Sequence, residues 1–475
     1  VLSTQFQQNL LADTKAFILV LETEDDLAGL PDFVRETAAA EAASRGMPGK
    51  WVITLQRPSI DPFLTFSARR DLREKAFAAW TARGDNANQY DNNAIIAEIM
   101  GLRIEMAKLL GFATFAAFIL DDRMAKTPAN AIDLMMKVWG PAREAAMRER
   151  DDLQAEVAAE GGNFAIEPWD WRYYQEKVRR ARFDLDQTEV KPYFQLEKLI
   201  EAQFFVANQL FGVTFSERTD IPVYLPDVRV WEVRDAAGAT VGLFYGDYFA
   251  RPTKNSGAWM SSFADQERIN GNVIPLILNN CNYNRGAPGE PVLLSLDDAR
   301  TLFHEFGHAL HGLLSNVTHP RIAGTSVPRD FVEFPSQVYE HWLMEDEILK
   351  RFAVHVETGK PIPDALIAKI RAARNVGQGF ATVEFVASAI VDMDFHQLTS
   401  AEGLDVDAFE KASLARIGMP REITMRHRTP HFSHVWGGGY AAGYYSYLWS
   451  EILDADGFDA FKEAGNIFDP ETAAR

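Results

Sequence analysis

The stretch LSLDDARTLFHEFGHALHGLL (residues 294–314) decides the fold class of this chain. Ser295 stands three residues before Asp298, a capping-box spacing that predicts the start of an α-helix. Apolar residues then recur at intervals of three and four, as on the buried face of a helix. Within the stretch lies HEFGH, in which His304 and His308 are four positions apart. Because a helical turn takes about 3.6 residues, both imidazoles project from one face.

Two imidazoles one turn apart can bind a single metal ion, and Glu305 stands beside them as a candidate base. This HExxH arrangement is typical of zinc peptidases. His311 follows near the same face, but a metal bound across one turn is poorly placed for a third ligand from that helix. We therefore expect His311 to pack or to support the ligands. All ten histidines of the chain lie between positions 304 and 434, which is either drift in composition or a functional cluster.

A catalytic zinc site takes three protein ligands and keeps one position open. Candidates for the third ligand lie in RDFVEFPSQVYEHW (329–342), where Glu333, Gln337 and Glu340 share a helical face at spacings of four and three. The alternative interpretation is a solvated acidic face, against which the flanking aromatic residues argue. The residues alone leave all three candidates open.

Composition limits the classes of function. The chain has 475 residues, 47% of them hydrophobic, so it can bury a large core, and its length predicts more than one lobe. The net charge of −19 disfavours nucleic acid and anionic membranes as partners. No apolar run approaches the roughly 20 residues that span a bilayer. The single cysteine, Cys281, excludes an intramolecular disulfide and suits a reducing compartment. We expect a cytoplasmic monomer.

The rest of the chain predicts a mainly α protein with one small sheet. Two strand-like runs, VRVWEVRD (228–235) and ATVGLFYGDYF (239–249), are joined by a predicted hairpin at residues 236–238, and NVIPLILNNCNY (272–283) is a candidate for a further strand. Helical periodicity marks the longer segments on either side. These helical segments are 93–112, 128–160, 170–186, 190–212 and 363–400.

The stretch HVWGGGYAAGYYSYLW (434–449) places three glycines directly before a run of tyrosines. If it is helical, Tyr440, Tyr444 and Tyr447 share one face at spacings of four and three. That face suits either a buried core stripe or a site, and the pattern alone leaves both open. Tyr445 and Trp449 are expected to pack into a core.

Three separated motifs resemble the M3 family of zinc metallopeptidases: FHEFGHALHG (303–312), GTSVPRDFVEFPSQVYEHW (324–342) and the glycine–tyrosine stretch (434–449). The stretches at 168–186 and 242–263 are similar to the bacterial peptidyl-dipeptidase branch (Dcp). The resemblance runs through essentially the whole chain. It implies a mainly α fold, a two-lobed helical ellipsoid with a deep central channel and a small β-sheet near the active site.

The resemblance also implies a division of the chain. Residues 1–227 would form a mainly helical lobe that walls the channel, and residues 228–475 the catalytic region. Relative to the family, the chain is expected to be incomplete at both ends. The channel would admit short unstructured peptides and exclude folded proteins.

Specific roles follow from the same resemblance. One Zn²⁺ per chain would be expected, with Glu333 as its third ligand and Glu305 as the base. The glycines at 437–439 would let a loop close over the substrate. Independently of the resemblance, Asp330 and Glu340 are the acidic residues nearest in sequence that could orient the imidazoles. In the glycine–tyrosine stretch, the implied catalytic residues are His434, Tyr440 and Tyr447, with Tyr444 near the substrate.

The predicted function is zinc-dependent release of C-terminal dipeptides from short peptides. Arg426 and Arg428 are candidates for holding the free carboxylate that such an enzyme must recognise. One alternative is an oligoendopeptidase of the oligopeptidase A type, which cuts internally. A second alternative is a non-catalytic peptide- or zinc-binding protein, against which the presence of Glu305 argues, because binding a metal does not require it.

Overall fold

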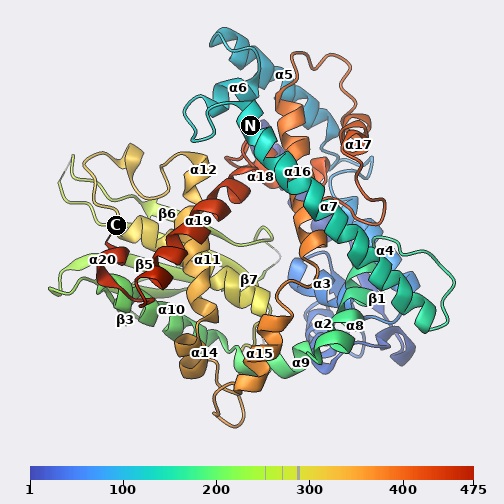
Figure 1. The fold of residues 1–475 in the computed structure, drawn as a ribbon, viewed down its shortest axis with the longest axis horizontal. Coiled ribbons are helices and arrows are strands. Elements are labelled where there is room, and N and C mark those ends of the chain that lie inside the picture. The colour runs from blue at the N-terminus through green and yellow to red at the C-terminus, as the bar shows by residue number, and fades with distance from the viewer. Residues whose placement is uncertain (252, 270, 286–288, 475) are drawn as a thin grey trace. The chain divides into compact units, whose positions relative to one another are not determined.

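The structure is a computed structural model that describes residues 1–251, 253–269, 271–285 and 289–474 (Figure 1). Residue 252, within the stretch 242–263 quoted above, lies outside the described part. The protein is mainly α with one small mixed sheet, as predicted. Among the described residues, no helix is long and apolar enough to cross a membrane.

The chain forms two compact units, and each is built from two separate segments. The first unit contains residues 1–185 and 369–445, and the second contains residues 186–368 and 446–475. The division that we predict at residue 227/228, into a helical lobe and a catalytic region, stays a prediction.

The first unit is helical apart from one two-stranded antiparallel ribbon of β1 (Ile18–Leu21) and β2 (Trp51–Thr54). This ribbon packs with the neighbouring helices around a core that includes Leu21, Ile53 and Phe63. The helices are α1 (Leu2–Ala16), α2 (Asp32–Ser44), α3 (Arg57–Phe66), α4 (Arg70–Thr81), α5 (Asn93–Leu109), α6 (Phe115–Leu120), α7 (Pro128–Ala159), α8 (Trp171–Phe183), α16 (Gln378–His396), α17 (Val406–Arg416) and α18 (Ser433–Trp436).

Two long helices of this unit, α7 and α16, lie side by side (Figure 1). They approach closely because a side chain is missing at Gly379, where a Cβ atom would lie 2.4 Å from the backbone nitrogen of Ala146. The predicted helical segment 363–400 is interrupted before α16. Gly377 there has a φ of 76°, a left-handed value that glycine adopts without steric cost and that ends helical geometry.

The second unit contains a five-stranded sheet in the order β3-β4-β5-β7-β6. Strands β5 and β7 are parallel, and the other neighbours are antiparallel. The predicted hairpin at residues 236–238 joins β4 to β5. The strands are β3 (Thr214–Glu217), β4 (Arg229–Arg234), β5 (Thr240–Phe249), β6 (Trp259–Ala264) and β7 (Leu276–Tyr283).

Helices both before and after the sheet in the chain pack against it. The chief helix is α11 (Leu296–Leu313), which lies against β7; a Cβ atom at Gly312 would be 2.7 Å from the Ile277 side chain of that strand (Figure 1). The remaining helices of the unit are α9 (Gln187–Val190), α10 (Leu196–Phe211), α12 (Arg329–Val332), α13 (Phe334–Glu340), α14 (Asp346–Phe352), α19 (Ser446–Glu463) and α20 (Pro470–Ala473). Helix α15 (Asp364–Ala372) contains the boundary between the two units.

Candidate metal centre and active site

Helix α11 begins where the sequence predicts. The Ser295 hydroxyl accepts from the backbone N–H of Asp298 at 3.0 Å, and the Asp298 carboxylate accepts from the backbone N–H of Ser295 at 3.1 Å. Phe306 then packs among the rings of Phe204 and Phe244, with centroids 5.5 and 5.2 Å away. These contacts fix both the start and the rotation of the helix, and so fix the direction of its histidines.

The glycine within HEFGH brings a second helix to the histidines. A Cβ atom at Gly307 would lie 2.6 Å from both the Pro335 carbonyl oxygen and the Ser336 Cα. The backbone of α13 therefore touches α11 at a point where any other residue would hold it away. Glu333 stands between α12 and α13, at the end of α13 that this contact draws toward the histidines.

The three residues His304, His308 and Glu333 form a compact group. Their ligand atoms all lie within 4.8 Å of one another. Glu333 Oε2 is 3.2 Å from His304 Nε2 and 3.0 Å from His308 Nε2. The Glu333 side chain is 1% exposed, so its carboxylate is almost completely withdrawn from water. Of the three candidates in residues 329–342, Glu333 is the one whose carboxylate meets both imidazoles.

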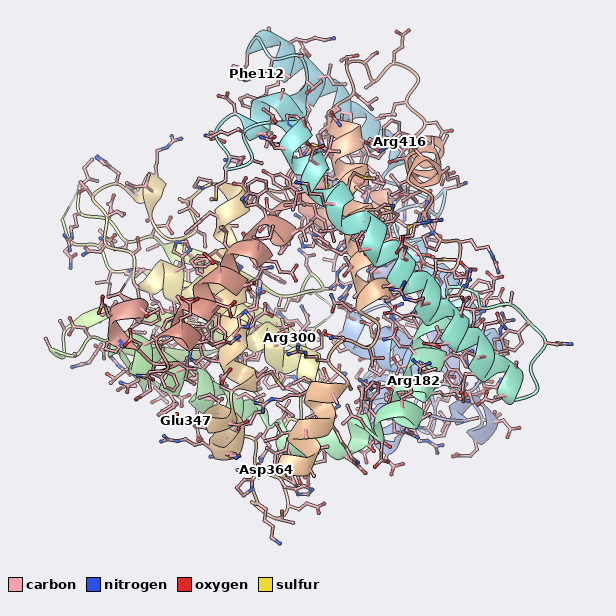
Figure 2. The ribbon with its side chains drawn as sticks, in the orientation of Figure 1. Phe112, Arg182, Arg300, Glu347, Asp364 and Arg416 are labelled. Atoms are coloured by element: carbon pink, nitrogen blue, oxygen red, sulfur yellow. The ribbon has the colours of Figure 1, made fainter. Side chains whose placement is uncertain are left out.

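Glu340 fixes the orientation of one imidazole from the other side. Its Oε1 lies 2.7 Å from His304 Nδ1, and its Oε2 lies 3.7 Å from Arg300 Nε. Arg300, labelled in Figure 2, is one helical turn before His304 on α11. A carboxylate that accepts from Nδ1–H leaves Nε2 as the ligand atom and raises its basicity.

Glu305 is buried beside this group with one carboxylate oxygen uncommitted. The residue is 4% exposed, and its Oε2 has no hydrogen-bond partner among the described residues. Burial raises the pKa of Glu305, and positive charge on His304 or His308 would lower it. A buried carboxylate without a partner costs free energy unless another group completes it. It therefore marks a position that a ligand or a reacting molecule would fill.

The charges of the group are strongly coupled. Burial lowers the pKa of His304, but its contacts with Glu333 and Glu340 outweigh burial and hold that pKa well above the usual value. For Glu333, burial raises the pKa, whereas the two imidazoles hold it well below its usual range. The carboxylate is therefore ionised, as a metal ligand has to be.

The donor set suits a zinc ion. Two imidazole nitrogens and a carboxylate oxygen form one of the ligand sets of catalytic zinc sites. Neighbouring donors around a tetrahedral zinc ion lie about 3.3 Å apart, given bonds of about 2.0–2.1 Å. The 3.0 and 3.2 Å separations around Glu333 Oε2 are close to that spacing. These separations are also hydrogen-bond lengths, so contacts with the Glu333 carboxylate hold the two imidazoles in place.

His311 and Asp330 are the two remaining residues near the metal ligands for which the sequence predicts a supporting role. His311 lies outside the group of three, and burial together with positive charge on His308 lowers its pKa to about 4. It is therefore a neutral imidazole, in line with a packing role. Asp330 is completely buried and accepts from the Ser450 hydroxyl through its backbone carbonyl at 3.0 Å. Its expected contact with an imidazole stays a prediction, whereas that of Glu340 is observed.

The glycine–tyrosine stretch is divided between the two units. His434, Tyr440 and Tyr444 belong to the first unit, where the His434 ring lies 5.9 Å from Tyr440 and 5.2 Å from Tyr444. Tyr447 belongs to the second unit, in the first turn of α19, and its carbonyl accepts from Gln337 Nε2 at 3.1 Å. The catalytic and substrate-binding roles of these residues stay predictions.

The continuous tyrosine face that a helix would create is not formed. Tyr440 lies outside any helix, residues 441–445 are turns, and α19 begins only at Ser446. Ala442 has a φ of 52°, a left-handed conformation that breaks helical geometry between Tyr440 and Tyr444. Tyr445 is buried as expected, at 1% exposure, while Trp449 is only half-buried.

The glycines before the tyrosines allow other atoms to approach the backbone closely, in addition to giving it conformational freedom. A Cβ atom at Gly437 would lie 2.5 Å from the Gln7 side chain, whose Nε2 donates to the Gly437 carbonyl. At Gly438, it would lie 2.9 Å from the His434 carbonyl oxygen. Neither glycine has a positive φ. Closure of this loop over a substrate stays a prediction.

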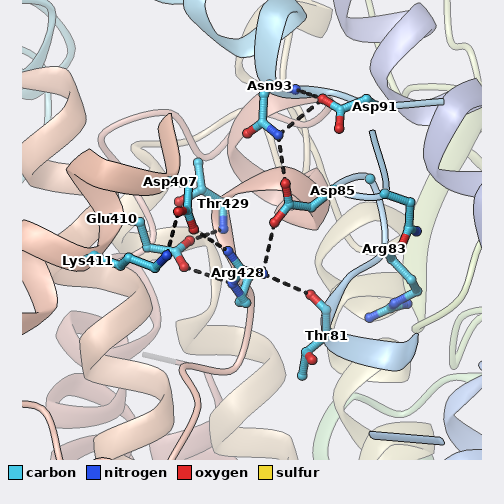
Figure 3. A network of polar contacts seen from close by, with 12 residues as sticks. Thr81, Arg83, Asp85, Asp91, Asn93, Asp407, Glu410, Lys411, Arg428 and Thr429 are labelled. Atoms are coloured by element: carbon cyan, nitrogen blue, oxygen red, sulfur yellow. Dashed lines mark hydrogen bonds and ion pairs between the residues drawn. The ribbon is translucent and has the colours of Figure 1, made fainter. Parts of the chain in front are cut away.

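Arg428 is occupied by internal ion pairs. Figure 3 shows its guanidinium among the carboxylates of Glu410, Asp85 and Asp407, at 2.8, 3.1 and 3.1 Å. A peptide carboxylate would have to displace one of these partners. Arg426 is also paired, 3.2 Å from the Glu384 carboxylate. The structure therefore gives no support to Arg428 as a carboxylate clamp.

Comparison with known proteins agrees with this geometry. The model of peptidase family M3 matches residues 63–475. The chain belongs to peptidase family M3. It is 44% identical to a protein named dipeptidyl carboxypeptidase from Escherichia coli (strain K12), over 98% of this chain and 69% of that relative. It is 36% identical to oligopeptidase A from the same strain, over 99% of this chain and 70% of the relative. Saccharolysin from Saccharomyces cerevisiae is 29% identical over 96% of this chain and 65% of its own length.

Membership of the M3 family makes this protein a metallopeptidase. Two parts of the site escaped sequence reasoning. Arg300 could have been found, because it lies four residues before His304 and therefore on the same helix face. The contact that Gly307 permits could not, because its partners at residues 335–336 are known only once α13 is placed.

Proposed function

We propose that this M3 peptidase is zinc-dependent and releases dipeptides from the C-termini of short, unstructured peptides. The observation that carries the proposal is the buried Glu305 carboxylate, which has an uncommitted oxygen beside the group of His304, His308 and Glu333. A protein that only stored a metal would need the group of three and not Glu305. The proposal of C-terminal dipeptide release is supported by 44% identity to a protein named dipeptidyl carboxypeptidase.

The residues divide the chemistry among them. His304, His308 and Glu333 would hold one zinc ion, which supplies a Lewis acid that polarises the scissile carbonyl. Glu340 keeps His304 in the tautomer whose Nε2 faces the site. Glu305, with its pKa raised by burial, is suited to take a proton from the attacking water and to give it to the departing amine.

The tyrosines complete the proposal. Tyr440 and Tyr447 would donate hydrogen bonds to the oxyanion that forms when the carbonyl is attacked, with His434 assisting and Tyr444 contacting the substrate. Loss of one such donor typically raises the barrier by about 2.7–4 kcal/mol. A monomer and a cytoplasmic location remain our expectations for the chain.

The competing function is internal cleavage, which 36% identity to oligopeptidase A favours. The two functions are separated by mass spectrometry of the products from one unstructured peptide, offered with a free and with an amidated C-terminus. Successive losses of dipeptides that amidation abolishes would establish the proposed function. Internal cuts that ignore amidation would replace it with the competing one.

A non-catalytic role is tested by Glu305→Gln. We expect the variant to keep its zinc, because the three ligands are untouched, and to lose hydrolysis. If hydrolysis survives at the wild-type rate, Glu305 is not the base. If the wild-type chain binds zinc and cleaves no peptide, the binding role replaces the enzyme.

A further inference from the structure

A chain of three polar side chains, two of them completely buried and one partly buried, runs through the first unit. Asp392 and His396 are one turn apart on α16, and the side chains of both are completely buried. His396 Nδ1 lies 2.7 Å from the Asp392 backbone carbonyl oxygen and 2.9 Å from the Asp392 carboxylate, and His396 Nε2 lies 2.6 Å from Arg103 Nη1. Because arginine can only donate, Nε2 accepts, and the imidazole proton sits on Nδ1 and points at Asp392.

The Asp392 carboxylate collects three consecutive backbone N–H groups. Its Oδ1 accepts from Ala442 at 2.9 Å, and its Oδ2 accepts from Gly443 at 2.9 Å and from Tyr444 at 3.0 Å. Successive N–H groups converge in this way when one residue of a turn is left-handed, which Ala442 is, with a φ of 52°. The turn therefore forms an anion-binding concavity, and an internal carboxylate fills it.

Arg103, at the far end of this chain of side chains, contacts the residues just before the glycines at 437–439. Arg103 Nη2 donates to the Val435 carbonyl at 2.8 Å, and its guanidinium lies 5.1 Å from the centre of the Trp436 ring. The backbone is thus fixed just before Gly437 and again at residues 442–444. Tyr440 stands between these two anchored points.

We propose that Asp392, together with His396 and Arg103, positions the turn that presents Tyr440 for catalysis. The inference rests on the proposed function, because it assumes that the Tyr440 hydroxyl acts on the reacting carbonyl. Asp392 touches no reacting atom in this scheme and is a positioning residue. Its charge matters because three backbone N–H groups donate to its two oxygens and the His396 imidazole lies 2.9 Å away, and a neutral amide, with one acceptor oxygen, cannot accept from all three donors.

The first test is Asp392→Asn, which keeps the shape of the side chain and turns an NH₂ group toward backbone donors. We expect kcat to fall by at least tenfold while KM changes less than threefold and zinc content is unchanged. Hydrogen exchange at the amides of residues 437–444 should speed up.

A matched control exists at the opposite end of α16. The Glu149 carboxylate accepts from the backbone N–H groups of Gly379 and Phe380, at 2.9 and 2.8 Å, and has no contact with the tyrosine turn. Glu149→Gln should lower stability comparably and leave kcat and the exchange of residues 437–444 unchanged. If both variants lose kcat in step with their loss of stability, Asp392 has only a structural role and the inference is wrong.

A double-mutant cycle separates positioning from stability. If Asp392 acts through Tyr440, then Asp392→Asn should cost kcat little more in a Tyr440→Phe background than Tyr440→Phe costs alone. In a Tyr447→Phe background, Asp392→Asn should lower kcat by the same factor as it does in the wild type. The reason is that Tyr447 lies on α19, outside the anchored turn. Additivity in both backgrounds would overturn the inference, and so would an unaltered kcat for Tyr440→Phe.

Two further outcomes are distinguishable. A wild-type chain that cleaves no peptide would refute the proposed function, whereas an active wild type with an equally active Asp392→Asn would refute only the positioning role. If Asp392→Asn fails to fold, Arg103→Lys carries the same measurements, because a single ammonium cannot reach His396 and Val435 together in the geometry of a guanidinium. A kcat for Arg103→Lys equal to that of the wild type would then decide against the inference.

Discussion

Glu340 and His304 form a directed pair, in which carboxylate Oε1 lies 2.7 Å from imidazole Nδ1. The pair determines which ring nitrogen is left to face Glu333, and it joins α13 to α11. In Glu340→Ala the ring would lose both its tautomer and its orientation. We expect zinc affinity to fall by about 10–100-fold, the usual cost of removing a partner of a ligating histidine.

Competition with a chelator measures this loss directly, without reliance on activity. Glu347→Ala is the matched control, because Glu347 is an exposed carboxylate on α14 and is labelled in Figure 2. An affinity for zinc that is the same in Glu340→Ala and Glu347→Ala would contradict the role assigned to Glu340.

Gly307→Ala tests whether close contact of α13 with α11 builds the metal group. Alanine favours a helix over glycine by about 1 kcal/mol, but here its Cβ would lie 2.6 Å from backbone atoms of α13. Overpacking of this kind costs about 1–3 kcal/mol. We expect lower stability by urea unfolding and weaker zinc binding.

Gly101→Ala is the control for helix propensity, since Gly101 is inside α5 with open space where its Cβ would be. It should stabilise the protein by about 0.4–1 kcal/mol. If Gly307→Ala is also stabilising and binds zinc normally, the backbone contact is less restrictive than the structure indicates.

Two histidines of the first unit, the buried His431 and the partly buried His427, should make stability depend on pH. Desolvation, followed by the nearby charges of His434 and of Arg426 and Arg57, holds the pKa of His427 well below its usual value. Burial, followed by Arg83 and Arg428, does the same for His431. In the unfolded chain these imidazoles gain protons below about pH 6.5, while the folded form stays neutral.

The sign of the effect follows from this difference. Stability is fully present above about pH 6.5 and falls as the solution is acidified, by up to about 1.4 kcal/mol per pH unit for each histidine. Urea unfolding between pH 7 and 5 measures the slope. His431→Gln should reduce the slope, and an unchanged slope in that variant would exclude His431 as a source.

Arg428→Met should destabilise the first unit without altering the preference for a free C-terminus. The change leaves Glu410, whose side chain is 4% exposed, as a buried carboxylate without its guanidinium partner. Breaking a buried pair in this way costs about 3–5 kcal/mol. The ratio of kcat/KM for free and amidated peptides should stay the same.

Arg416→Met is the comparison for Arg428→Met. Arg416, labelled in Figure 2, pairs with Asp394 at a site where the arginine side chain is 54% exposed. An exposed pair contributes about 0–1 kcal/mol. A selective loss of activity on free C-termini in Arg428→Met would restore Arg428 as a clamp.

Local signals made the chief features predictable. The capping box at Ser295 and Asp298 and the helical period placed α11, and strand-like apolar runs placed β4, β5 and β7. Strands β3 and β6 were missed, because neither has more than partly buried side chains and so neither shows a hydrophobic pattern.

What sequence reasoning missed depends on contacts between distant segments. The helical tyrosine face failed because Ala442 is left-handed, and that conformation is matched by Asp392, fifty residues earlier in the chain. The local sequence around residue 442 does not predict this conformation or its contact with Asp392, since alanine normally favours a helix. The residues alone likewise could not choose Glu333 over Gln337 and Glu340. That choice depends on how α13 approaches α11.

The alternation of segments between the two units has a consequence during protein synthesis. Helix α19 contacts both short helices that flank Glu333: Ser450 donates to Asp330, and Gln337 donates to Tyr447. A chain emerging from the ribosome exposes the HEFGH helix long before α19 exists. The metal-binding unit of the nascent protein therefore stays incomplete until residues 446–463 are translated, and its apolar surface is exposed in the meantime.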